Sequence, residues 1–120
     1  MANPFVHIEL TTDNPSKAKE FYGSLFSWGL EDMPMPNGVY TMVKAGDGPG
    51  GGMMGKPSPD VPTAWLPYVE VDSVDATVAK AKKLGAKIMR DKTPIPQMGA
   101  FAILIDPTGG AIGVWETGKK

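Results

Sequence analysis

The residues of this sequence that could do chemistry are few, and the imidazole among them is unique. His7 is the only histidine, and the chain has no cysteine. Any reaction that needs an imidazole must therefore use His7, and no step can use a thiolate as nucleophile or metal ligand. Glu9 follows closely in the sequence and offers a carboxylate. These side chains could orient or protonate a ligand, or contribute to a metal site.

Alternation of residue types places both side chains on one face of a strand. Residues 5–10 read FVHIEL, a period-two pattern that predicts a strand with one covered face. Since successive side chains point to opposite faces, His7 and Glu9 share the face that does not cover the following helix. That helix begins after a capping residue, Asp13 or Asn14. The strand residues expected to cover it are Val6, Ile8 and Leu10.

The same order of elements recurs in the second half of the chain. Residues 65–71 alternate like the first strand and are followed by a second capped, amphipathic helix. One common shift along the sequence lays Tyr68 on His7 and Glu70 on Glu9. Matched strand, cap, helix and further strands predict two related βαβββ units.

The repeat defines the expected domain organisation. A chain of 120 residues favours one domain. We expect an α+β fold of two βαβββ units, residues 1–55 and 64–120, joined by a proline-rich linker at residues 56–63. Proline and glycine also predict a loop over residues 31–38, and a second loop over residues 91–97 after a short strand.

Composition excludes several classes of partner. The formal net charge is −1, which favours neither nucleic acid nor an anionic membrane surface as a partner. No long apolar run indicates a signal peptide or a membrane span. Together with the absence of cysteine, these features lead us to expect a cytoplasmic protein.

Two motifs resemble a known superfamily. A strand bearing His7, a capped helix with Phe21-Tyr22 and a following Gly29 are similar to the first βα unit of the vicinal oxygen chelate superfamily. This superfamily includes lactoylglutathione lyases, bleomycin-resistance proteins and extradiol dioxygenases. Residues 106–109, DPTG, resemble the turn before its last strand. The resemblance implies a glyoxalase-like fold in which paired units form a cupped mixed sheet around a ligand cavity.

The resemblance also implies positions for a metal ring, and most of them lack a ligand here. Lactoylglutathione lyases of this fold take one His or Glu ligand from each of four strands. His7 occupies the first position, whereas the others fall on Leu66, on Gly113 and within residues 50–54. A divalent ion needs three or four protein ligands, so we expect no metal and no other cofactor. If a metal does bind, His7 is the one family-type ligand that remains.

The remaining candidate residues are carboxylates and aromatic side chains of the predicted strands. By the internal repeat and the resemblance, His7 and Tyr68 are the candidate catalytic residues. Aromatic side chains could stack on a flat ligand, and carboxylates could fix its orientation. The candidate ligand-binding residues are Glu9, Trp65, Glu70 and Trp115. The methionines, 8 in all, could form a soft and adaptable pocket wall.

Three functions remain open from the sequence. The first is a glyoxalase-like protein that binds a small organic ligand in a concave cavity without the usual metal ring. The second is a metal-dependent lyase, isomerase or dioxygenase that uses His7 with non-standard carboxylates such as Glu9 and Glu70. The third is an antibiotic-sequestering protein like the bleomycin-binding members.

The resemblance and the exposed sheet faces together predict a homodimer. A four-stranded sheet with one helix has only one face covered, so its other face must be paired. We expect an interface that buries more than about 1,000 Å² in total, above the range of most crystal contacts. Light scattering at micromolar concentration should give twice the mass of one chain. A monomer mass would contradict this prediction.

Overall fold

The protein is described by a computed structural model that covers residues 2–35 and 38–118. These residues form two compact units. The N-terminal unit is Val6–Leu66, and the C-terminal unit is Pro67–Lys120 together with Met1–Phe5. Each unit contains a strand, a helix and three more strands, which confirms the α+β class and the two βαβββ units.

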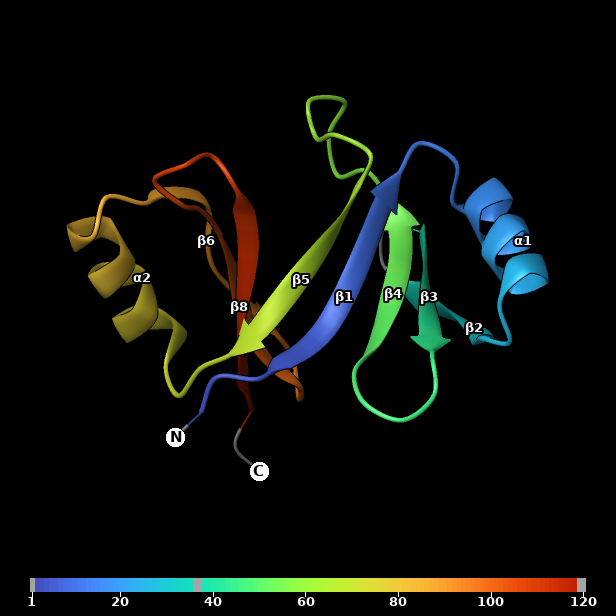
Figure 1. The fold of residues 1–120 in the computed structure, drawn as a ribbon, viewed down its shortest axis with the longest axis horizontal. Coiled ribbons are helices and arrows are strands. Elements are labelled where there is room, and N and C mark those ends of the chain that lie inside the picture. The colour runs from blue at the N-terminus through green and yellow to red at the C-terminus, as the bar shows by residue number, and fades with distance from the viewer. Residues whose placement is uncertain (1, 36–37, 119–120) are drawn as a thin grey trace. The chain divides into compact units, whose positions relative to one another are not determined.

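The N-terminal unit is a four-stranded mixed sheet with one helix (Figure 1). Its elements are β1 Phe5–Thr12, α1 Pro15–Leu25, β2 Gly29–Met35, β3 Gly38–Lys44 and β4 Gly50–Gly55. The strands lie in the order β2-β3-β4-β1. Only β1 and β4 are parallel, and the other neighbours are antiparallel.

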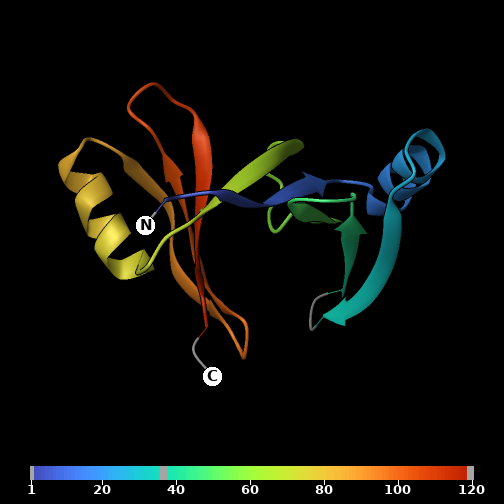
Figure 2. The same ribbon diagram turned by 60° about the horizontal axis from the view of Figure 1, so that its bottom comes forward.

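The C-terminal unit repeats this arrangement. Its elements are β5 Ala64–Glu70, α2 Val74–Lys83, β6 Lys87–Ile95, β7 Gly99–Ile105 and β8 Ala111–Thr117, with residues 64–66 of β5 belonging to the N-terminal unit. The strand order is β5-β8-β7-β6, again with one parallel pair, β5 and β8. Figure 2 shows α2 alongside the strands of this unit. Residues 56–63, between β4 and β5, form no helix or strand.

Side-chain caps fix the start of both helices. The Asn14 side chain accepts a hydrogen bond from the backbone N–H of Lys17 at 3.1 Å, so Asn14 caps α1. Asp13 instead forms an ion pair with Lys56 at 3.3 Å. Ser73 caps α2 by accepting from the backbone N–H of Ala76 at 3.1 Å. Each cap satisfies an N–H group that has no partner within its helix.

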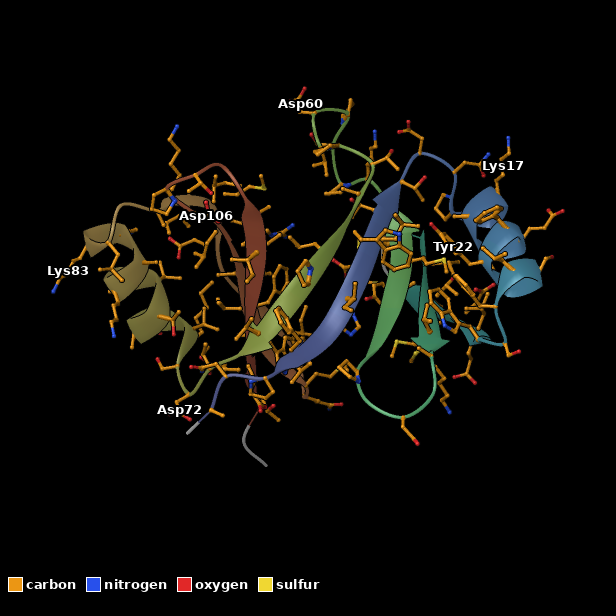
Figure 3. The ribbon with its side chains drawn as sticks, viewed as in Figure 1. Lys17, Tyr22, Asp60, Asp72, Lys83 and Asp106 are labelled. Atoms are coloured by element: carbon orange, nitrogen blue, oxygen red, sulfur yellow. The ribbon has the colours of Figure 1, made fainter. Side chains whose placement is uncertain are left out.

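Alternation along the strands builds one core on the helix side of each sheet. In the N-terminal unit Leu10, Val43 and Met53 are buried, and Ala18 and Tyr22 of α1 pack against them. The core of the C-terminal unit consists of Val74, Val78, Ala102, Leu104 and Val114. Figure 3 shows Lys17 and Lys83 extending away from the strands, on the outer sides of the two helices.

Two predicted loops are strands in the structure. Residues 31–35 belong to β2, and β6 continues through Pro94 to Ile95. Residues 36–37 of the first predicted loop lie outside the described residues. Both strands are at an edge of their sheet, where a proline needs no ladder hydrogen bond on its outer side. Pro34 and Pro94 are therefore compatible with strand pairing, and β6 adapts further through two register shifts.

The glycine-rich segment 50–55 forms a central strand because its neighbours approach closely. A Cβ atom on Gly51 would overlap the carbonyl oxygen of Ile8 in β1, and one on Gly50 would lie 2.7 Å from the carbonyl oxygen of Val43 in β3. A backbone carbonyl cannot move aside without breaking the ladder. Glycine thus lets β4 lie between β1 and β3 at these positions.

A carboxylate from the last strand completes the start of α2. Oε1 of Glu116 in β8 accepts a hydrogen bond from the backbone N–H of Val74 at 2.7 Å. Glu116 therefore points to the helix side of the sheet, as its place in the alternation predicts. Negative charge at a helix N-terminus is also favoured by the helix dipole. Within the described residues, no helix has the length and apolar character needed to cross a membrane.

This contact predicts a measurable loss of stability. Glu116→Gln should lower the free energy of unfolding by about 1 kcal/mol, because a charged acceptor at the N-terminus of α2 becomes a neutral one. The matched control is Glu20→Gln on the exposed side of α1. Urea unfolding of both variants measures the difference. Equal effects of the two substitutions would contradict the capping role of Glu116.

Candidate functional site

The face of the N-terminal sheet away from α1 carries a hydrogen-bonded polar cluster, which we call the His7–Tyr40–Glu9 triad. The hydroxyl of Tyr40 lies 2.7 Å from Nε2 of His7 and donates to Oε1 of Glu9 at 2.9 Å. The rings of His7 and Tyr40 are nearly parallel, with an interplanar angle of 18°. All three side chains are partly buried. Strands β1 and β3 thus bring together groups that are 33 residues apart in the sequence.

The hydroxyl group of Tyr40 links the two charged or polar partners of the triad. A phenol has one hydrogen to donate, and Tyr40 donates it to Glu9. The direction of the short contact with Nε2 of His7 depends on the tautomer of the imidazole. The tautomer with its proton on Nε2 matches this arrangement, because Nε2–H then donates to Tyr40 and Tyr40 donates to Glu9.

Burial controls the charge of the imidazole. Desolvation lowers the pKa of His7, while the nearby charge of Glu9 raises it by a smaller amount. The pKa therefore lies below its ordinary value of 6.5, and the imidazole is neutral at neutral pH. A neutral His7 with a proton on Nε2 agrees with the hydrogen-bond directions in the triad.

Gly52 leaves the space that the phenol occupies. Gly52 is paired with Glu9 in the register of β1 and β4, and a Cβ atom on it would overlap the Tyr40 hydroxyl and ring. Gly50 is likewise paired with His7. The segment 50–54, where the resemblance places a metal ligand, therefore offers glycine beside both polar residues and no carboxylate. A longer side chain at residue 52 and the phenol in its present position exclude each other.

These residues do not fit a metal ring of the family type. Across residues 2–35 and 38–118, no three His, Cys, Asp or Glu side chains gather in a way that could hold a metal ion. His7 and Glu9 alone are too few for a divalent ion of fixed geometry. On the C-terminal unit, Gly113 is paired with Tyr68, and a Cβ atom on Gly113 would overlap the Tyr68 ring.

The corresponding face of the C-terminal unit is aromatic. The rings of Tyr68 and Phe101 meet edge to face, with centroids 6.1 Å apart. Phe101 is also the register neighbour of Trp115, and the Arg90 guanidinium lies 5.4 Å from the centre of its ring. Tyr68 is buried at 5% exposure, whereas Trp115 is partly buried. This unit therefore offers stacking surfaces beside one cation.

Two other predicted site residues have different surroundings. Glu70 accepts a hydrogen bond from the Thr117 hydroxyl at 2.9 Å, which holds its carboxylate at the end of β8. Trp65 packs on the helix side of the sheet, where its indole N–H donates to the Tyr22 hydroxyl at 3.3 Å and its ring meets Trp28 edge to face. Strand alternation likewise places the odd-numbered residues of β5 opposite Tyr68 and Glu70.

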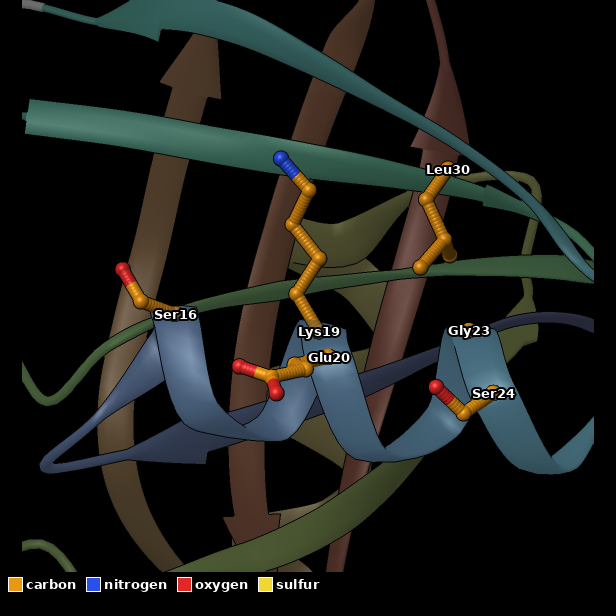
Figure 4. A pocket seen from close by; sticks show the side chains of 6 residues that line it. All are labelled: Ser16, Lys19, Glu20, Gly23, Ser24 and Leu30. Atoms are coloured by element: carbon orange, nitrogen blue, oxygen red, sulfur yellow. The ribbon is translucent and has the colours of Figure 1, made fainter.

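Two hollows of the N-terminal unit lie away from the triad. The larger, of about 400 Å³, runs between α1 and β2 and is lined by Ser16, Lys19, Glu20, Gly23, Ser24 and Leu30 (Figure 4). Lys19 in it is paired with Asp32 at 2.6 Å. The smaller, of about 170 Å³, is apolar and includes Trp28 and Trp65. Neither hollow is lined by His7, Glu9 or Tyr40.

Sequence reasoning missed Tyr40 and Phe101. Tyr40 lies in β3 and Phe101 in β7, each on the same face as a predicted site residue. The alternation of residues 39–44 could have placed Tyr40, but not its register against His7. That register depends on how β3, β4 and β1 pair, which local pattern does not determine.

The comparisons with known proteins agree with the fold. Residues 5–114 match the Glyoxalase/Bleomycin resistance protein/Dioxygenase superfamily. The Mycobacterium bovis protein named "Putative glyoxylase CFP32" is 36% identical over 117 residues, covering 93% of this chain and 45% of that protein. A crystal structure of a hypothetical protein from Bacillus halodurans superposes with a TM-score of 0.75 and 17% identity, covering 100% and 98% of the two chains. A structure of methylmalonyl-CoA epimerase from Streptomyces coelicolor superposes with a TM-score of 0.72 and 14% identity, covering 98% of this chain and 96% of that chain.

The chain belongs to the glyoxalase, bleomycin-resistance and dioxygenase superfamily, since the match spans nearly all of its strands and both helices. The structural neighbours, below 20% identity, support the fold alone. The chain spans about half the length of the curated relatives it matches.

The lowered pKa of His7 predicts a pH-dependent stability. Because the folded pKa lies below the ordinary value of 6.5, the unfolded chain binds a proton first as the pH falls. The contribution of neutral His7 to the free energy of unfolding is therefore complete above pH 6.5 and is lost as the pH drops toward the folded pKa. Tyr40 contacts the imidazole, and the charge of Glu9 acts on it from nearby.

The measurement compares urea unfolding of the wild type and His7→Gln between about pH 7.5 and pH 5. The wild type should lose more stability than the variant over the acidic part of this range. Other groups titrate in both proteins, so the difference between them isolates the imidazole. Identical pH dependence in the two proteins would contradict a depressed pKa for His7.

Proposed function

We propose that this chain binds a small organic molecule on the strand face that carries the His7–Tyr40–Glu9 triad, without the family's usual metal ring. One observation carries the proposal: a partly buried, hydrogen-bonded polar cluster stands on a sheet face beside several methionine side chains. A few fixed polar groups among apolar side chains are the usual composition of a small-molecule site.

The side chains next to the triad are suited to contact the apolar part of a ligand. Register places Met33 and Met42 on the same face as Tyr40, since Tyr40 pairs with Met33 and Met42 pairs with Gly52. Met54 follows Gly52 by two residues and therefore shares that face. Methionine is flexible and polarisable, so it adapts to apolar ligands of varied shape.

In the C-terminal unit, Tyr68, Glu70 and Trp115 remain the proposed ligand-contacting residues. Tyr68 and Trp115 share the aromatic face that Phe101 completes. Each unit presents its own set of groups, so the contributions of the two can be measured separately by substitution. The homodimer is part of this proposal, and exposed Phe21 and Leu25 on α1 offer apolar surface that an interface would cover.

Enzymatic activity is the second candidate function. The triad contains a base and a carboxylate joined by a phenol, which are groups that can move protons on a bound ligand. A lyase or isomerase would use such groups, and the name of the mycobacterial relative refers to a glyoxylase. A dioxygenase or a metal-dependent lyase would need a donor set that the described residues do not supply. Sequestration of an antibiotic would need binding alone.

A thermal-shift screen of a small-molecule library tests the proposal. A ligand at one hundred times its dissociation constant should add about 2.7 kcal/mol to the free energy of unfolding. The shift should be lost in His7→Ala and kept in Glu20→Gln, which changes the exposed side of α1. Hits that stabilise His7→Ala as strongly as the wild type would place binding elsewhere, and a screen without hits would count against ligand binding.

A further inference from the structure

We infer that Tyr40 takes the place of the metal in the N-terminal unit: its phenol joins His7 and Glu9 into one hydrogen-bonded group of net negative charge, which receives a cationic ligand end. The phenol itself is a positioning group, and Glu9 supplies the charge. The choice of ligand rests on the proposed function, whereas the arrangement of the triad does not.

The first step is geometric. Family-type ligand positions on β1 and β4 are adjacent, and here they hold His7 and a glycine segment. The Tyr40 hydroxyl stands 2.7 Å from Nε2 of His7 and 2.9 Å from Oε1 of Glu9. Two hydrogen bonds of one hydroxyl thus hold together the two side chains.

The second step concerns the glycine. The Tyr40 ring occupies the space where a side chain on residue 52 would lie, because any Cβ atom there would overlap the Tyr40 hydroxyl. In the C-terminal unit a Cβ atom on Gly113 would overlap the Tyr68 ring, although Tyr68 belongs to the first strand of its unit and Tyr40 to β3. In both units a tyrosine ring lies over the glycine of a strand that pairs in parallel with the first strand of that unit. A phenol ring thus fills the space of a side chain in the segments where the resemblance places metal ligands.

The third step concerns charge. With His7 neutral, the triad has one negative charge, that of the Glu9 carboxylate. Register places Glu31 beside Met42 and Lys44 beyond it on the same face, so this face also carries one charge of each sign. The Glu9 carboxylate gives the triad itself a negative charge. An anionic ligand end is repelled there, and a cationic end is attracted.

The fourth step concerns the rest of the ligand. Met33, Met42 and Met54 lie on the same face as the triad, and methionine sulfur contacts aromatic rings favourably. The structure thus favours an arylalkyl ammonium ion over an aryl carboxylate. Benzylammonium and benzoate are a suitable pair of probes, because they have similar size and opposite charge.

Nitrogen-15 NMR of the ring nitrogens tests the triad. His7 is the only histidine, so a tag-free, labelled chain gives one unambiguous imidazole signal. At neutral pH the wild type should show the neutral ring with its proton on Nε2. Tyr40→Phe should lose this preference and show a mixture of tautomers, while Tyr22→Phe on the opposite face should keep it.

A second variant covers the case in which Tyr40→Phe does not fold. Gly52→Ala should push the phenol away from its present position and give the same loss of tautomer preference. A proton on Nδ1 in the wild type, or an unchanged tautomer in both Tyr40→Phe and Gly52→Ala, would overturn the triad.

The same imidazole signal reports on the probes. Benzylammonium should shift it at concentrations at least about tenfold lower than benzoate, as expected from opposite charges beside one carboxylate. In Glu9→Gln this preference should disappear. Tighter binding of benzoate would overturn the ligand class. No shift with either probe would overturn the ligand class and count against the proposed function, and the tautomer result would still decide the triad.

Discussion

The candidate site depends on one steric constraint: the Tyr40 phenol and a side chain at residue 52 cannot occupy the same space. Because residue 52 is glycine, the phenol can lie against β4 and reach both His7 and Glu9 on β1. The close pairing of β4 between β1 and β3 depends on the neighbouring glycines for a related reason, since backbone carbonyls stand where their Cβ atoms would be. The composition of one short strand thus determines both how the sheet is assembled and which polar groups meet on its face.

This constraint changes how the family resemblance applies to the chain. The superfamily fold is shared, as the match over residues 5–114 demonstrates. The chemistry of a fold is a property of its site, and here the donor atoms for a metal ring are missing from the described residues. What stands in that region is an imidazole, a phenol and a carboxylate joined by hydrogen bonds. Such a group holds protons and charge rather than a Lewis acid.

Much of the fold could be predicted from the sequence because its signals are local. Alternation over residues 5–10 and 65–71, the capping residues and the DPTG turn each depend on neighbours in the chain, and the structure confirms these elements. The two errors, at Pro34 and Pro94, arose because strand position within a sheet is not a local property. A proline that would break a central strand is tolerated at an edge.

Less of the candidate site than of the fold could be predicted from the sequence. Alternation placed His7 and Glu9 on one face, but the partner that joins them comes from β3, and its register is set by tertiary pairing. Trp65 shows that suitability for stacking does not determine position, since it packs against the core with Tyr22 and Trp28. Phe101 was overlooked because its contact with Tyr68 forms across β8, the strand that lies between β5 and β7.

The central claim is that a tyrosine-centred triad stands where the family has a metal ring. Elemental analysis tests it most directly: the purified chain is incubated in turn with zinc, nickel, cobalt and manganese, and free metal is removed by gel filtration. The account predicts that no stoichiometric metal is retained by the wild type. Retention of one metal per chain, lost in His7→Ala, would contradict it.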